Sequence, residues 1–217
     1  EGRSDVKSVC GDYPAVISFD LGHIELGDTM SLDKVPFTKI RKEILNQYKR
    51  GGMSSLSWHL RNPLTGGDSW DVSDTTVVKS ILPGGANHEK FTGWVSKVSA
   101  FINSLQTEEG VKVPVLFRPW HEHTGSWFWW GEKLCTPEEY KALWHITVDI
   151  LRNDGVDNAL YAYSPGSEPQ DTAQYLKRYP GDELIDLIGF DTYQFERDTY
   201  LANLEKSLAI VDSIGKV

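Results

Sequence analysis

Apolar residues along the chain recur with two spacings, one typical of buried strands and one typical of amphipathic helices. Short runs rich in β-branched and aromatic residues predict strands at 15–19, 53–58, 113–117, 160–163 and 185–190. Between these runs apolar residues return every three or four positions, which predicts helices over about 36–50, 91–105, 137–154 and 201–214. Strands that alternate with helices in this way form a parallel sheet.

Helix boundaries are clearest around Thr136. Thr136 and Glu139 form a capping box, and Pro137 between them suits the first helical position. Residues 1–14 contain few apolar positions, and the pattern predicts no regular element there.

Chemically versatile residues follow the predicted strands directly. Each of these positions lies at or just beyond a strand end: Asp20, His59, Glu122, Ser164, Asp191 and Tyr193. This placement is typical of a (β/α)8 barrel, whose sites lie at the carboxyl ends of the strands. A doubly wound sheet is the alternative, but the turn at 18–22 is not the Gly-rich phosphate-binding turn that such sheets usually carry. Since a barrel has eight strands, we expect an incomplete α/β TIM barrel here.

Length and charge limit the possible functions. At 217 residues the chain can bury one sizeable core, so we expect a single catalytic domain over 1–217. The formal net charge of −9, with no basic stripe, argues against a nucleic-acid partner. No apolar run approaches the ~20 residues of a transmembrane helix. A neutral substrate is the simplest match.

The segment 113–131 is the strongest candidate for a site. Its strand leads into Arg118, His121, Glu122 and His123, interleaved with four tryptophans. Aromatic faces stack on sugar rings, and a carboxyl group among indoles loses hydration, which favours the protonated form that a general acid needs. An exposed loop glutamate is the plain alternative for Glu122. The setting favours carbohydrate chemistry.

Other candidates are weaker when taken alone. A lone histidine such as His59 is often structural, although its place after a strand favours a site. Asp191 and Tyr193 lie two residues apart and share a face, but an Asx-type cap beside a core tyrosine would produce the same pattern. The tryptophans at 127, 129 and 130 cannot all face a ligand, so one or two of them should pack into the wall.

The sequence fits two other kinds of site less well, a metal site and a side-chain nucleophile. His121 and His123 would point the same way on an extended segment, but the helical His-x-x-x-His spacing of zincins is absent. A mononuclear site would need ligands from distant segments, so a metal-dependent hydrolase is the weaker alternative, and we expect no metal and no cofactor. The chain has no Gly-x-Ser-x-Gly elbow, and neither Cys10 nor Cys135 has the setting of a nucleophile. Their separation leaves a disulfide open.

Two motifs carry a family resemblance. The run 117–122, FRPWHE, followed by GSWFWW at 125–130, closely resembles glycoside hydrolase family 26. Ser57-Trp58-His59 and the run GFDTY at 189–193 support it. That family consists chiefly of endo-β-1,4-mannanases, with some β-glucanases and β-1,3-xylanases. The resemblance implies a retaining (β/α)8 glycosidase that acts on mannans.

The resemblance also implies roles for individual residues. Glu122 matches the general acid/base, and His121 matches the histidine beside it. His59 matches a histidine that contacts the sugar in the −1 subsite, where Trp127 matches the aromatic platform. Tyr193 matches the tyrosine that hydrogen-bonds the nucleophile. The remaining expected substrate-binding residues are Asp191, at a site position, and Trp70, as a further stacking residue.

The chain departs from the family pattern in its strand count. The strand before Glu122 should be the fourth, so the visible strands correspond to the second to sixth, and Gly215-Lys216-Val217 would enter the seventh. The nucleophile is then expected outside these residues, and Glu196, which follows the sixth strand, does not take its place. A non-catalytic carbohydrate-binding barrel is the alternative. The polymeric substrate predicts a secreted, periplasmic or cell-surface protein, although no signal peptide is present.

Overall fold

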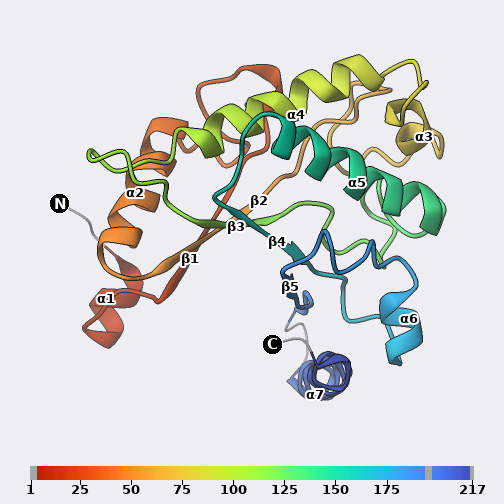
Figure 1. Cartoon of the computed structure of the whole chain (residues 1–217). Helices are drawn as coiled ribbons and strands as arrows, with labels where there is room; N and C mark the ends of the chain where they lie inside the picture. Colours follow the sequence, from red (N-terminus) through yellow and green to blue (C-terminus); the bar gives the residue numbers. More distant parts are fainter. Residues whose placement is uncertain (1–3, 194–196, 216–217) are drawn as a thin grey trace.

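The computed structural model describes residues 4–193 and 197–215 (Figure 1). The strands are β1 (Val16–Asp20), β2 (Met53–Ser57), β3 (Val115–Arg118), β4 (Ala159–Tyr163) and β5 (Leu187–Ile188). The helices are α1 (Asp5–Cys10), η1 (Ile24–Leu26, a 3-10 turn), α2 (Phe37–Lys49), α3 (Val77–Ile81), α4 (His88–Asn103), α5 (Pro137–Asn153), α6 (Thr172–Leu176) and α7 (Arg197–Ile214).

The strands form one parallel sheet in the order β1-β2-β3-β4-β5. Each strand pairs with the next one along the chain, so the order never reverses as it does in a doubly wound sheet. Within the described residues the sheet is open. The predicted fold class, an incomplete α/β barrel, is therefore confirmed.

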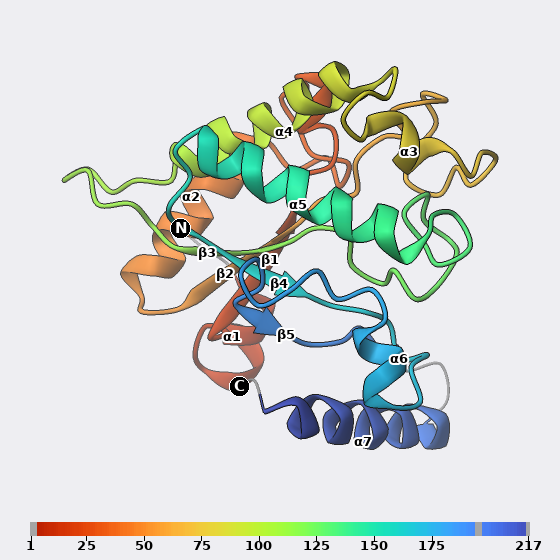
Figure 2. The ribbon, with the colours of Figure 1, turned by 45° about the vertical axis from the view of Figure 1, so that its right-hand side comes forward.

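One face of the sheet holds the core. Helices α2, α4 and α5 lie along this face (Figure 1). Leu56, Phe117 and Tyr161 are paired with one another across β2, β3 and β4, so their side chains lie on the same face of the sheet. All three are buried there. On the opposite row Leu160 remains 44% exposed. Figure 2 shows α6 and α7 side by side, apart from these three helices.

The capping box at the start of α5 is confirmed. The Thr136 hydroxyl accepts a hydrogen bond from the backbone N–H of Glu139 (3.1 Å), and the Glu139 carboxylate accepts one from the N–H of Thr136 (2.9 Å). These bonds satisfy two donors at the helix start.

Several elements differ from the sequence expectation. The strand expected from Val113 begins at Val115, because Pro114 has no N–H to pair. The strand expected over 185–190 is limited to Leu187–Ile188. Helix α1 was not expected; its start is capped by Ser4, whose hydroxyl accepts from the N–H of Lys7. Helices α3 and α6 have five residues each, too few to show a periodic pattern.

Three further expectations concern the cysteines, the membrane and the chain end. Cys10 is exposed, Cys135 is buried, and both are free. No helix in the described ranges is long and apolar enough to span a bilayer. Glu196 and the predicted entry into a further strand at 216–217 lie outside the described residues.

Candidate active site

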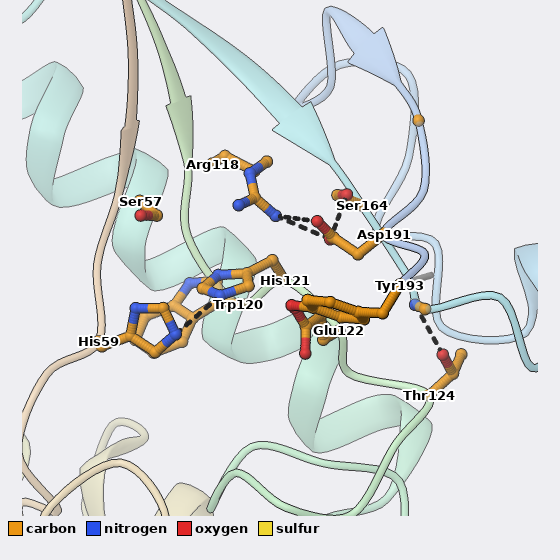
Figure 3. Close-up of polar contacts among 12 residues, drawn as sticks. Ser57, His59, Arg118, Trp120, His121, Glu122, Thr124, Ser164, Asp191 and Tyr193 are labelled. Atoms are coloured by element: carbon orange, nitrogen blue, oxygen red, sulfur yellow. Dashed lines mark hydrogen bonds and ion pairs between the residues drawn. The ribbon is translucent and has the colours of Figure 1, made fainter. Parts of the chain in front are cut away.

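The expected site residues gather where the strands end. Side chains that follow β2, β3, β4 and β5 converge at one edge of the sheet (Figure 3). The structure brings His59, His121, Glu122, Asp191 and Tyr193 together there. His59 contacts His121, Tyr193 binds Glu122, and Asp191 binds Arg118 and Ser164. Trp70 and Trp127 adjoin these residues through His59 and Glu122.

The loop after β3 has an unusual backbone. Trp120 and Glu122 have φ values of 56° and 53°, in the left-handed region that few residues other than glycine adopt. Each such residue costs about 1–3 kcal/mol, so the conformation persists only because the surroundings hold it. The alternation twists the chain, so that His121 and His123 face different surroundings.

Contacts from four directions hold this loop. The Tyr140 hydroxyl donates to the carbonyl of Trp120 (2.7 Å), and the Trp130 indole donates to the carbonyl of His121 (2.9 Å). The N–H of Glu122 itself donates to the carbonyl of Ser164 (2.8 Å). Residues 120–122 thus each have a backbone group fixed by a residue farther along the chain, which accounts for the strained conformation.

Arg178 supplies the fourth anchor. It is buried beyond α6, stacks on the Tyr140 ring (4.2 Å from guanidinium carbon to ring centroid), and donates to the carbonyl of His123 (2.6 Å). The same guanidinium donates to the carbonyl of Trp130 (3.3 Å) and to the carbonyl (3.3 Å) and sulfur (2.7 Å) of Cys135. One side chain therefore ties together three segments of the loop around Glu122.

The Glu122 side chain is held at both oxygens. Its Oε2 accepts a hydrogen bond from the Trp127 indole N–H (2.9 Å), and its Oε1 accepts one from the Tyr193 hydroxyl. The residue is only 6% exposed. Partial burial and the neighbouring carboxylate raise the pKa of Tyr193, so its hydroxyl remains a donor. The carboxyl group thus has one fixed direction at the edge of the sheet.

Two histidines meet beside Glu122. Nε2 of His59 lies 3.1 Å from Nε2 of His121, and Nδ1 of His59 lies 2.6 Å from a carboxylate oxygen of Asp20. Burial, and then the positive charges of Arg118 and His59, lower the pKa of His121 well below its usual value, so this ring is neutral.

Asp20 is ionised in this setting. Burial alone would raise the pKa of Asp20. The hydrogen bond and positive charge of His59, together with the hydrogen bonds from Ser57 and Gly22, outweigh burial and lower this pKa to about 2.

Acidification is expected to weaken the fold through Asp20. Because the folded pKa, about 2, lies below the ordinary 3.8, ionised Asp20 stabilises the native state above about pH 4, and this contribution disappears as the pH falls from about 4 toward 2. The shift corresponds to about 2 kcal/mol. Urea unfolding at about pH 6 and about pH 2 measures most of it. Asp20→Asn should lose less stability between the two conditions than the wild type; an equal loss would contradict the assignment.

Asp191 belongs to a second charged group. Its oxygens accept from one Arg118 nitrogen (2.8 and 2.7 Å), and one of them also accepts from the Ser164 hydroxyl (2.6 Å) (Figure 3). Burial raises the pKa of Asp191, opposed by the charge of Arg118. The carboxylate is thus held between an arginine and a hydroxyl, a few residues from Tyr193.

The tryptophans divide into a wall and a platform. Trp129 and Trp130 are fully buried, whereas Trp127 is 39% exposed and Trp70 is 50% exposed. Trp70 stacks on the His59 ring with centroids 5.3 Å apart and planes 10° apart. The expectation that only some of these indoles face a ligand agrees with this arrangement.

The His-Glu-His run does not form a metal site in the described residues. His121 lies against His59 and Phe128, whereas His123 is fully buried between the rings of Tyr140 and Tyr163, with centroids 4.4 and 4.8 Å away. Burial lowers the pKa of His123 well below its usual value. The premise that both histidines point the same way is wrong, because the segment is coiled rather than extended.

Several residues of the site have no assigned role in the sequence interpretation. Asp20, Arg118 and Ser164 stood out only by their positions at strand ends, and Arg178 gave no signal. A carboxylate and a histidine that follow adjacent parallel strands, as Asp20 and His59 do, are a usable sign of such a pair. Arg178 is 55 residues from the His123 carbonyl that it binds, and only the tertiary structure reveals it.

Comparison with known proteins places the chain in a family. The sequence model of Glycosyl hydrolase family 26 matches residues 1–212. The chain belongs to this family. A solved structure of a GH26 beta-mannanase from Bacteroides ovatus is 61% identical, with a TM-score of 0.98, over 100% of this chain and 63% of that chain. The solved structure of a modular endo-beta-1,4-mannanase from Cellulomonas fimi is 35% identical, with a TM-score of 0.87, over 97% of this chain and 48% of that chain.

Curated relatives include a mannan endo-1,4-beta-mannosidase from Bifidobacterium adolescentis. It is 38% identical over 198 residues, which cover 88% of this chain and 20% of that protein. The family 26 chain thus spans less than two thirds of the length of each of these relatives.

Proposed function

We propose that the protein carrying this chain is an endo-β-1,4-mannanase that hydrolyses mannan, galactomannan or glucomannan with retention, and that Glu122 is its general acid/base. The observation that carries the proposal is the fixed carboxyl of Glu122, bound by Trp127 and Tyr193 beside the histidine pair. The family 26 relatives described above are named as mannanases, which supports the substrate class.

The first step breaks the glycosidic bond. Glu122 gives its proton to the leaving oxygen while a second carboxylate attacks the anomeric carbon and forms a glycosyl-enzyme. In retaining enzymes the two carboxyl groups stand about 5–5.5 Å apart. We place this nucleophile on a glutamate outside the 217 residues. Asp191 is a carboxylate in the site, but its oxygens are bound to Arg118 and Ser164 and are not free to attack.

The second step returns the proton. Glu122, now a carboxylate, takes a proton from water as the water attacks the glycosyl-enzyme, which restores both groups. Trp127 and Tyr193 keep the carboxyl in place during both steps, and Trp127 offers its exposed face to the −1 sugar. His59 and His121 supply ring nitrogens toward the same sugar, and Trp70 extends the aromatic surface beyond His59.

Product analysis tests the activity and its alternatives. An endo-mannanase lowers the viscosity of galactomannan early while it releases reducing ends, whereas a non-catalytic carbohydrate-binding barrel releases none. Parallel assays on mixed-linkage glucan and on xylan separate the proposal from a β-glucanase or xylanase of the same family. A chelator should leave the rate unchanged, since the proposal uses no metal. Absence of reducing ends from every mannan by the full-length protein would overturn the proposal.

A polymer cannot enter the cell intact, so we also place this activity outside the cytoplasm, in a secreted, periplasmic or surface-bound protein. Fractionation of the producing cells, with detection of the protein by antibody, tests the placement. A protein found entirely in the cytoplasm would contradict it.

Replacing Trp127 separates its two contributions. Trp127→Phe keeps an aromatic face but removes the indole N–H that binds Glu122. Loss of a hydrogen bond to a charged group costs about 1.5 kcal/mol, which is about tenfold in kcat/KM. Steady-state rates on mannooligosaccharides measure it. Trp127→Ala should be slower still, because it loses the stacking face as well; equal rates for wild type and Trp127→Phe would contradict the assigned bond.

A further inference from the structure

The geometry points to Asp20 as a positioning residue that acts through His59. We propose that the Asp20 carboxylate fixes the His59 ring and its Nδ1 proton, so that Nε2 is directed to His121 at the site. The inference rests on the proposed function, in which His59 faces the sugar.

The Asp20 carboxylate cannot rotate freely. Its Oδ1 accepts from the backbone N–H groups of Gly22 (2.7 Å) and His59 (3.1 Å). Its Oδ2 accepts from the Ser57 hydroxyl (2.6 Å) and lies 2.6 Å from Nδ1 of His59. With two partners on each oxygen and only 8% exposure, the carboxylate is a rigid support for the ring.

The support depends on a close approach of two loops. A Cβ at Gly22 would lie 2.6 Å from the carbonyl oxygen of His59 and 2.9 Å from Oδ1 of Asp20. Glycine therefore lets the segment after β1 come close to the segment after β2. Asp20 ends β1 and His59 follows β2, so the contact joins the carboxyl ends of adjacent strands, where the site lies.

Asp20 also determines where the protons of the histidine pair lie. A carboxylate accepts, so Nδ1 of His59 must carry a proton toward it. The two facing Nε2 atoms then share one proton: either His121 donates to a neutral His59, or a cationic His59 donates to His121. Both arrangements keep Nδ1 of His59 protonated, as the carboxylate that orients a catalytic histidine does.

Other charges face the histidine pair. Burial and the charge of Arg118, which ends β3, lower the pKa of His121. Burial and the charges of Arg118, Glu122 and His59 shift the pKa of Asp191, which follows β5. Glu122 is held by Trp127 and Tyr193. Among these groups only Asp20 lies within hydrogen-bond distance of Nδ1 of His59, whereas Nε2 faces His121, so removal of the Asp20 carboxylate should act mainly on His59.

A spectroscopic test does not require activity. In Asp20→Asn the side chain keeps its shape, but its NH2 group can face Nδ1, which favours the tautomer of His59 protonated at Nε2. Ring ¹⁵N shifts of the full-length protein labelled at histidine, with His59 assigned through His59→Gln, report this proton. We expect Nδ1 of His59 to be protonated in the wild type and to lose that state in Asp20→Asn.

Asp28→Asn is the matched control. It alters an Asp–His pair outside the site, in which Oδ2 of the exposed Asp28 lies 3.7 Å from Nδ1 of the half-buried His23. The His59 shifts should not change in this variant. Identical His59 shifts in wild type and Asp20→Asn would overturn the proposal, whatever the protein hydrolyses.

Kinetics then test the positioning role. We expect Asp20→Asn to lower kcat/KM on mannooligosaccharides about 10- to 100-fold, as loss of an outer-shell partner does. The double variant Asp20→Asn/His59→Gln should be no slower than His59→Gln alone, because both changes remove the same function, that of the His59 ring. Fully multiplicative losses would contradict action through His59. If no variant and no wild type hydrolyses mannan, the proposed function fails, while the ¹⁵N result still decides the positioning of the ring.

Discussion

Glu122→Ala is expected to lower kcat on mannan by about three orders of magnitude in the full-length protein, since general acid–base catalysis contributes about 10²–10⁴-fold. The leaving oxygen of a polysaccharide is a poor leaving group and needs the proton that Glu122 supplies. An aryl mannoside with a good leaving group needs little protonation, so its glycosylation step should be nearly retained. Burst kinetics on the aryl substrate, beside steady-state rates on mannan, measure both effects.

Glu132→Ala provides the matched control for this loss. Glu132 is an exposed carboxylate on the same loop as Glu122, between β3 and α5, and it pairs with Lys177 (3.1 Å). Its replacement should leave both substrates hydrolysed at the wild-type rate. A Glu122→Ala variant that loses both substrates equally would indicate a binding or folding role for Glu122 instead of proton transfer.

Arg178→Met is expected to lower the free energy of unfolding by about 3 kcal/mol, because it leaves buried carbonyl groups without donors, at about 1–3 kcal/mol each. The carbonyls of His123 and Cys135 accept from this guanidinium, and the carbonyl of Trp130 accepts from it and from the Cys135 thiol (3.5 Å). Burial raises the pKa of Cys135 to about 11, so its sulfur is a neutral thiol at neutral pH. The thiol cannot take the place of the Arg178 guanidinium as a charged donor to these carbonyls. Urea denaturation at neutral pH measures the change.

Arg152→Met is the comparison for Arg178. Arg152 is exposed and donates to one backbone carbonyl, that of Glu183 (2.9 Å). Its replacement should cost less than about 0.5 kcal/mol. Similar losses for the two variants would show that Arg178 is not the buried tie between the segments around Glu122.

Regular elements were predictable because their patterns are local. The alternation of strands and helices, the capping box at Thr136, and the polar residues after each strand all follow from spacing and residue type. The strand beyond Ile185 was predicted too long: only Leu187 and Ile188 are assigned to β5, although the N–H of Asp186 and that of Gly189 still donate to β4 carbonyls. An apolar run does not show where ladder geometry stops.

The detailed site was not predictable, because it depends on contacts between distant segments. The left-handed backbone at Trp120 and Glu122 separates His121 from His123, and no feature of the sequence signals it. Tyr193 was matched to a contact with the nucleophile, but in this structure its hydroxyl binds Glu122. The support of His59 by Asp20 likewise appears only when β1 and β2 are placed side by side.

The product formed by Glu122→Ala in the presence of azide tests the central claim most directly. Without a general base the glycosyl-enzyme from an aryl mannoside persists, and azide needs no base to attack it. Attack on that intermediate gives the β-mannosyl azide, with faster turnover than in azide-free buffer. Proton NMR of the product identifies the anomer. The account predicts the β-azide; an α-azide would make Glu122 the nucleophile, and no azide product would contradict its role as the acid/base.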